Sequence, residues 1–326
     1  MLTDTKVRIV SYIKTNGQAK VKDLATHLAL GNVAIHRQLK KLVAAGQLAK
    51  VGTPPKVFYV LANRTLSSPS LPANALLDNY FAYVDPTGHL NTGLAGFRIW
   101  LKNVGKVEQE QSLLKRYALD RTEANSLFNS AGLIDATVNI GRTFNNEMNL
   151  DRVFYLDFYS LPTFGKTRLG TSVLYAKQSE NQEMIRQLAG EAQSKLTPLI
   201  TDLGIEAVGF LPHSILRKVQ FLKEFADRLN LTLPKIELIK AYPGEIRVAQ
   251  KTLGRLEERI QNARETIFVN NNKTRFKRVL LIDDAVGSAA TLNETARKLK
   301  NMGIAQEVYG FAIVGSLKGF EVIREV

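Results

Sequence analysis

The second half of the chain alternates between strand-like and helix-like segments, and this alternation restricts the possible fold more than any other feature. Strand-like apolar runs lie at 153–159, 207–212, 235–241, 278–283 and 307–315. Helix-like runs lie between them, at about 180–202, 214–230, 249–264 and 291–302. Such a repeat folds into a mostly parallel sheet with helices on both faces. We therefore expect an α/β domain over residues 151–326.

One strand of this domain ends in an unusual group of residues. The run from Val279 to Ile282 is continuously apolar, as a strand buried on both faces requires, and Asp283 and Asp284 follow it directly. In open parallel sheets, ligands bind at the carboxyl ends of the strands. We therefore expect the two carboxylates to face a ligand, although adjacent acids also cap loops and helices.

The residues after the two acids are small or hydroxylated, and a helix is expected to begin at Thr291. A phosphate can bind the free N–H groups at such a helix start. Carboxylates cannot contact phosphate, but they accept hydrogen bonds from vicinal hydroxyls. The pattern therefore predicts a sugar phosphate, bound by Asp283, Asp284, Gly287, Ser288, Ala289, Ala290 and Thr291.

Two other protein classes that place acids after a strand are excluded. Receiver domains need about a hundred further residues, whereas 42 follow Asp284. A dinucleotide site needs GxGxxG after the first strand, and that motif is absent.

The segment 279–292 resembles the PRPP-binding signature of type I phosphoribosyltransferases, and residues 150–326 are similar to the competence-protein ComF branch of that family. Further similarity lies in AVGFLPHSILRK and in the order Gln250, Leu253, Arg259, Asn262, which has one extra residue after Leu253. The resemblance implies a type I phosphoribosyltransferase-like fold with Asp283 and Asp284 as the catalytic acids on the ribose hydroxyls. It also implies ligand contacts at Pro212 and Lys177, and Mg²⁺ held through bound PRPP.

The sequence departs from that family in ways that affect the expected activity. The usual N-terminal cysteine zinc module and the Arg-Gly-Phe-Asn-Gln stretch are absent, and Gly287 and Ala289 stand where Thr and Gly are common. If position 289 needs a positive φ, the Cβ of Ala289 strains the loop by about 1 kcal/mol or more. These departures favour ligand sensing over fast turnover.

Positive charge is concentrated in the first fifth of the chain. Residues 1–63 contain ten Lys and Arg against two Asp and no Glu, whereas the rest of the chain supplies only six charges of the net +14. A small, strongly basic domain suits a polyanionic partner, because neutralised phosphates release counterions. A solubilising surface is the alternative that charge alone leaves open.

The order of elements over 5–61 resembles the winged helix-turn-helix family of bacterial regulators. Three helix-like segments are followed by two strand-like runs, QLAKV and KVFYV, joined by a turn at 52–55. Ile35, Leu39, Leu42 and Val43 are expected to face inward from the third helix. The opposite face would then contact double-stranded DNA through Val33, Arg37, Lys40 and Lys41. Further contacts are expected from His36 at the flank of that face, from Asn32 in the turn before the helix, and from Lys50 and Lys56 of the hairpin. A winged helix used for protein contacts is the alternative.

The remaining features give weaker expectations. Residues 63–74 are rich in Ser and Pro and are expected to form a linker, so we divide the chain into 1–63, a linker and helical connecting module over 64–150, and 151–326. With no cysteine and four histidines, thiolate metal sites are excluded. No apolar run of 18 residues and no signal peptide occur, so we expect a cytoplasmic protein without a membrane partner. DNA half-sites would suit a homodimer.

Two functions follow from these observations. In the first, the protein is a DNA-binding transcriptional regulator that senses PRPP or a related nucleotide. In the second, it is an active phosphoribosyltransferase, a pentosyltransferase that releases pyrophosphate, with an accessory winged helix. The sequence leaves both open.

Overall fold

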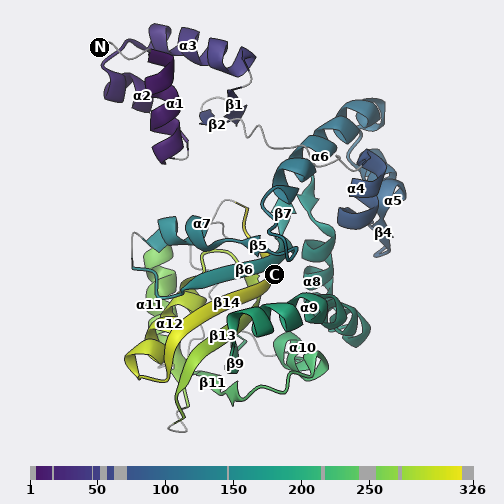
Figure 1. Ribbon diagram of the computed structural model, residues 1–326. Helices are drawn as coiled ribbons and strands as arrows, with labels where there is room; N and C mark the ends of the chain where they lie inside the picture. The colour runs from purple at the N-terminus through teal and green to yellow at the C-terminus, as the bar shows by residue number, and fades with distance from the viewer. Residues whose placement is uncertain are drawn as a thin grey trace. The chain divides into compact units, whose positions relative to one another are not determined.

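The computed structural model describes residues 5–16, 18–45, 47–51, 57–61, 72–144, 147–213, 217–241, 255–270 and 274–317. It divides the chain into two compact units, Met1–Ser70 and Leu71–Val326. Figure 1 labels helices and strands of both units.

The N-terminal unit consists of three helices followed by an antiparallel strand pair. The helices are α1 (Thr5–Asn16), α2 (Val21–Leu28) and α3 (Asn32–Ala44). The strands β1 (Leu48–Val51) and β2 (Phe58–Leu61) pair with Leu48 opposite Leu61. Apolar residues at helical spacing form its core, because they line one side of each helix: Ile9, Ile13, Leu24, Leu28, Ile35, Leu39 and Leu42.

The inward face of α3 differs from the expected one at a single residue. Ile35, Leu39 and Leu42 are buried, but Val43 is 36% exposed. At 100° per residue Val43 lies about 80° from Ile35 around the helix, at the margin of the buried stripe. The prediction that Val43 points inward is therefore wrong.

The C-terminal unit contains a six-stranded sheet in the order β10-β9-β13-β14-β6-β5. Its strands are β5 (Ile134–Asp135), β6 (Arg152–Phe158), β9 (Ala207–Phe210), β10 (Lys235–Ile236), β13 (Phe276–Val286) and β14 (Ala305–Gly315). Every neighbouring pair is parallel except β5 and β6. The prediction of a mixed α/β fold with a mostly parallel sheet is confirmed, and β13 is one of its central strands.

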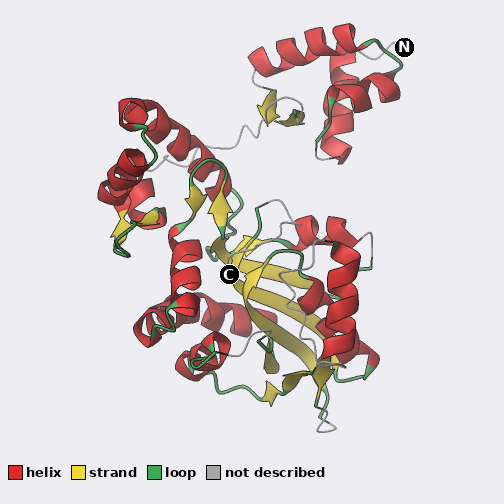
Figure 2. Ribbon diagram, turned by 180° about the vertical axis from the view of Figure 1, so that it is seen from behind, coloured by secondary structure: helices red, strands yellow, loops and turns green. Residues whose placement is uncertain are grey.

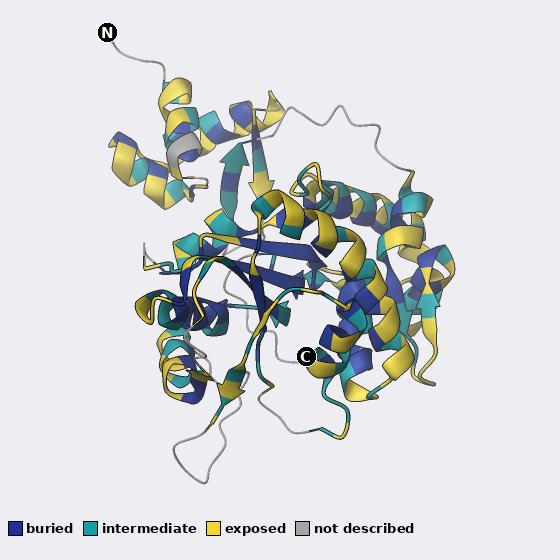
Figure 3. Cartoon of the chain, turned by 60° about the horizontal axis from the view of Figure 1, so that its bottom comes forward, coloured by how far each residue is buried: buried dark blue, intermediate teal, exposed yellow. Residues whose placement is uncertain are grey.

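Two layers of helices cover the two faces of this sheet (Figures 1 and 2). One layer contains α8 (Arg168–Gln178), α9 (Gln182–Leu203) and α10 (Phe221–Leu229), and it packs on Leu280 and Ile282 of β13. The other contains α11 (Leu256–Thr266) and α12 (Ala290–Asn301), and it packs on Val279 and Leu281. Burial on both faces explains why β13 is continuously apolar, and Figure 3 shows the sheet as the buried centre of the unit.

Residues 72–150 form several short elements that pack with the rest of this unit. They are α4 (Ala73–Tyr80), β3 (Ala82–Val84), β4 (Leu90–Thr92), α5 (Gly93–Asn103), the 3₁₀ turn η1 (Val107–Gln109), α6 (Glu110–Asn125), β5, α7 (Thr137–Gly141) and η2 (Arg142–Phe144). A fully buried Arg121 on α6 holds Asp157 of β6 at 2.8 Å. An ion pair of this kind is costly to break, because either partner alone would leave a buried charge.

Several elements differ from those expected for this unit. Helix α8 was not predicted, because RLGTSVLYAKQ is rich in Gly, Ser and β-branched residues, and burial stabilises it instead. The expected strand at 235–241 divides into β10 and β11 (Leu238–Lys240), and β11 pairs with the unpredicted β12 (Ile267–Val269). The remaining strands β7 (Ser160–Leu161) and β8 (Gly165–Lys166) form a small hairpin.

Across the residues described, no helix combines the length and the apolar character that crossing a bilayer requires.

Candidate ligand site at the carboxyl edge of the sheet

Asp283 and Asp284 lie in the last part of β13, three and two residues before the strand ends at Val286. Both side chains are partly buried, and the backbone N–H of Asp284 donates to Asp283 Oδ1 at 2.9 Å. The Nζ of Lys177, at the end of α8, lies 2.7 Å from Asp284 Oδ2. The acid pair is therefore contacted by a cation from a helix that is distant in the sequence.

The electrostatic environment of Asp283 favours its protonated form. Burial, and then the charge of Asp284, raises the pKa of Asp283 to about 7. Burial lowers the pKa of Lys240, at the end of β11, to about 8, and the charge of Asp283 opposes this effect. Lys177 and Lys240 thus place two cations around the acid pair. Because the pKa of Asp283 is close to neutral pH, a small change in its surroundings alters its protonation.

The loop after β13 turns sharply into α12. Ala289 has φ +59° and ψ +11°, in the left-handed region, so the condition for strain at this position is met. The hydroxyl of the buried Ser288 accepts from the backbone N–H of Ala290 at 3.3 Å. The backbone N–H of Ser316, after β14, donates to the Val286 carbonyl at 2.9 Å and fixes the start of the loop.

The neighbouring strand β9 ends beside the acids. Phe210 pairs with Ile282, and the Leu211 N–H donates to the Ile282 carbonyl at 2.9 Å, so Pro212 follows at the same edge. Partial burial, and then nearby Lys240, lowers the pKa of His213. Residues 214–216, which follow His213, lie outside the described residues.

The structure thus brings together sequence-predicted residues from three separate segments: α8, the end of β9, and β13 with its loop. Sequence reasoning missed Lys240 and His213 as neighbours of this site, and it also missed Arg217, whose guanidinium donates to the Lys177 carbonyl. Lys240 could have been found, because it ends a predicted strand at the edge where ligands bind. In the part of the chain that the structure describes, no group of three or more acidic or His residues could hold a metal ion.

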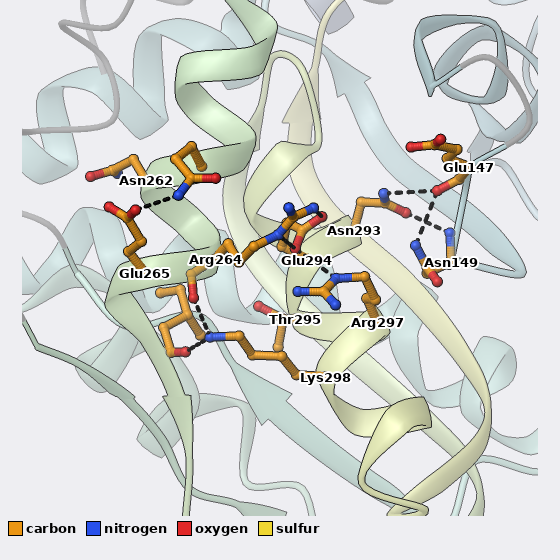
Figure 4. Close-up of polar contacts among 12 residues, drawn as sticks. Glu147, Asn149, Asn262, Arg264, Glu265, Asn293, Glu294, Thr295, Arg297 and Lys298 are labelled. Atoms are coloured by element: carbon orange, nitrogen blue, oxygen red, sulfur yellow. Dashed lines mark hydrogen bonds and ion pairs between the residues drawn. The ribbon is translucent and has the colours of Figure 1, made fainter.

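A second polar cluster lies along α12, on the side facing α11 (Figure 4). The buried carboxylate of Glu294 accepts from Arg264 at 3.1 and 3.2 Å and from Arg297 at 2.8 Å. Asn293 Oδ1 accepts from the Asn149 N–H at 2.6 Å. These groups line a surface hollow of about 360 Å³, but they bond to one another, so the cluster fixes α12 against α11 and the chain leading to β6.

The predicted DNA-contacting side chains lie on the surface of the N-terminal unit. Val33 is 84% exposed, and the other exposed members on α3 and β1 are Asn32, His36, Arg37, Lys40, Lys41 and Lys50. Lys56 lies outside the described residues. Val33, Arg37, Lys40 and Lys41 lie on the side of α3 opposite Ile35, Leu39 and Leu42, whereas His36 lies at its flank and Asn32 lies in the first turn, on the side of Leu39.

Comparisons with known proteins give little further information. No family model matches this chain, and no curated protein matches it. Among solved structures, a hypoxanthine phosphoribosyltransferase from Staphylococcus aureus matches over 43% of this chain and 67% of that chain, with 14% identity and a TM-score of 0.26. This is a weak likeness to a phosphoribosyltransferase fold.

Proposed function

We propose that this protein is a DNA-binding transcriptional regulator whose C-terminal unit binds PRPP or a related nucleotide. The observation that carries the ligand assignment is the acid pair near the end of β13, followed directly by the bend into α12. The bend leads into the N-terminus of α12, an end of a helix that favours an anion, and the acids supply acceptors in the strand before it. A phosphate next to a diol is the chemistry that matches both groups.

Each part of the site has a distinct task in this proposal. Asp283 and Asp284 accept hydrogen bonds from the ribose hydroxyls, while the loop from Gly287 to Thr291 binds the 5′-phosphate. Lys177 and Lys240 contribute positive charge near the acid pair, where the highly charged diphosphate of PRPP would otherwise meet only carboxylates. Mg²⁺ would enter with PRPP, because the ligand's own phosphates supply most of the oxygen atoms that the ion prefers.

Two observations favour sensing over turnover. Ala289 holds a left-handed conformation that glycine adopts without strain, and Lys177 already pairs with Asp284. A site arranged in this way can bind a ligand without being organised for rapid chemistry. The alternative function is an active phosphoribosyltransferase, and release of pyrophosphate from PRPP in the presence of a panel of purine and pyrimidine bases distinguishes the two.

For the N-terminal unit, we propose a winged helix that reads DNA with α3. The support is the basic charge concentrated in this unit and the exposed Arg37, Lys40 and Lys41 on the side of α3 that faces away from its core. Arg37 would form a bidentate contact with guanine, and the lysines would contact phosphates. Two copies of the chain, as a homodimer, would read two half-sites.

Calorimetric titration of the full chain with PRPP and Mg²⁺ tests the ligand assignment. The wild type should release binding heat, and the double variant Asp283→Asn/Asp284→Asn should lose it, because the amides carry no negative charge and donate hydrogen bonds as well as accept them. Asp202→Asn, at an exposed position on α9, is the matched control and should bind as the wild type does. Absence of heat and of any thermal shift in the wild type would remove the ligand assignment.

A further inference from the structure

The two ends of helix α8 contact different parts of the C-terminal unit. At its C-terminal end, Lys177 pairs with Asp284 at 2.7 Å, and the Lys177 carbonyl accepts from Arg217. Two residues beyond the helix, Glu180 accepts from the Val219 N–H at 2.9 Å. This end therefore contacts both the acid pair and the segment that follows β9.

The N-terminal end of α8 contacts the first elements of the C-terminal unit. Arg168 Nε donates to the Asn79 carbonyl in the last turn of α4 at 2.8 Å, and Thr167 forms a backbone bridge with Phe81. Arg168 also pairs with Glu191 on α9. Arg168 therefore contacts the first described helix of this unit, the one that follows the N-terminal unit in the chain.

Between these ends, α8 is one uninterrupted helix that packs closely on the chain at the end of β6. Its buried side packs within the core, and a Cβ added at Gly170 would lie 2.0 Å from the Tyr159 carbonyl oxygen. The Thr167 hydroxyl caps the helix by accepting from Gly170 N–H at 3.0 Å, and it donates to the Phe158 carbonyl at 2.6 Å. From Arg168 to Lys177 the helix rises by about 14 Å, so a displacement at one end reaches the other.

We propose that α8 relays ligand occupancy at the acid pair to the chain segment leading to the N-terminal unit, with Lys177 as the group that the ligand displaces. This inference rests on the proposed PRPP site. Lys177 Nζ contacts Oδ2 of Asp284, the carboxylate that the ribose hydroxyls would use, so in this proposal a ribose bound at Oδ2 displaces Lys177. Displaced Lys177 no longer holds the end of α8, and Arg168 carries the resulting shift to α4.

Coupling of this kind is reciprocal, and this property makes the relay measurable. If PRPP changes the affinity for DNA by some factor, saturating DNA must change the affinity for PRPP by the same factor. Arg168 belongs to neither proposed binding surface, so its replacement should alter the coupling factor while each separate Kd stays the same.

The experiment measures the Kd for PRPP with Mg²⁺, in the absence and presence of a saturating DNA duplex selected by the full-length protein from a randomised pool. In the wild type, we expect the two values to differ by about fivefold or more, the lower end of typical allosteric coupling. In Arg168→Ala, the logarithm of this ratio should fall by at least half. Arg168→Lys should do the same, since it retains a positive charge beside Glu191 and loses the Nε donor to Asn79, and it covers the case in which the alanine variant does not fold.

The control variant is Glu191→Gln, which removes the ion pair of Arg168 but leaves the Asn79 contact, and it should retain the wild-type ratio. If the wild type showed no binding heat with PRPP and Mg²⁺, the proposed function itself would be overturned. Binding of both PRPP and DNA with a ratio near one would overturn the relay alone. A ratio unchanged in both Arg168 variants would also overturn it, because the coupling would then bypass α8.

Discussion

The two proposed functional surfaces are built in opposite ways. On α3, the proposed DNA-contacting side chains are exposed and take no part in the core, which is formed by the other side of the helix. At the acid pair, Asp283 is partly buried, its pKa is raised to about 7, and its neighbour is held by Lys177. The charged side chains on α3 change the free energy of unfolding little, whereas ionisation of Asp283 lowers it. The predictions below test this difference.

The largest effect is expected on the exposed surface. The triple variant Arg37→Ala/Lys40→Ala/Lys41→Ala should lower the affinity for DNA on the order of 100-fold at physiological salt, because several phosphate and base contacts are lost together. Its thermal midpoint should stay close to that of the wild type, since all three side chains are exposed. Fluorescence anisotropy and thermal melting measure the two quantities. Unchanged DNA affinity would contradict the proposed role of α3.

Single variants on the same helix should divide into two kinds. Arg37→Ala should cost about 1–3 kcal/mol at one base position and relax sequence preference there. Lys40→Ala should weaken binding to all sequences and reduce the slope of log affinity against log salt by about 1. Affinities for a set of duplexes across a salt series separate the two effects. Identical behaviour of both variants would show that α3 is oriented differently in the groove.

Asp283 should make the stability of the C-terminal unit depend on pH. Its pKa in the folded state is raised above the unfolded value, so the folded state holds the proton more tightly and stability falls as pH rises from about 4 to about 7. Asp283→Asn should therefore stabilise the protein at pH 8 by about 1–2 kcal/mol and have little effect at pH 4. Urea unfolding at both pH values tests this. The control Asp202→Asn, at an exposed site, should show no such dependence. Destabilisation by Asp283→Asn at pH 8 would indicate that the carboxylate is favourably paired.

The smallest effect concerns two alanines with the same backbone conformation, one in each unit. Ala29 ends α2 at φ +54°, and Ala289 precedes α12 at φ +59°. Replacing either residue by Gly should stabilise the protein by about 0.5–1 kcal/mol, since the Cβ strain is removed. Only Ala289→Gly should also change the Kd for PRPP, because only that residue belongs to the proposed phosphate loop. Denaturant unfolding and calorimetry check both effects, and equal Kd values in the two variants would place the phosphate elsewhere.

Much of the architecture follows from local sequence patterns. The apolar run from Val279 to Ile282 predicts a strand covered on both faces, and the sheet has β13 between β9 and β14. The periodic stripe of Ile35, Leu39 and Leu42 predicts the buried side of α3. Patterns of this kind succeed because burial acts on every turn or every second residue, and this regularity is visible in the sequence. At the edge of the stripe, where Val43 lies, the pattern gives no firm answer.

Other features depend on contacts between distant segments. Helix α8 has weak intrinsic propensity, and its N-terminal cap, its close approach to Tyr159 and its buried side stabilise it. The strand at 235–241 divides because β11 finds β12 as a partner, which the apolar pattern alone does not reveal. Tertiary packing overrides local preference at both places.

The sequence alone determined where the acids, the small-residue bend and the basic N-terminal segment lie along the chain, because these are properties of composition and spacing. Only the tertiary structure decided that Lys177 pairs with Asp284, that Lys240 approaches Asp283 and that Ala289 adopts a positive φ. Charges interact through space, and burial sets the strength of that interaction. The shift of the Asp283 pKa and the ion pair between Lys177 and Asp284 therefore arise only once the chain has folded.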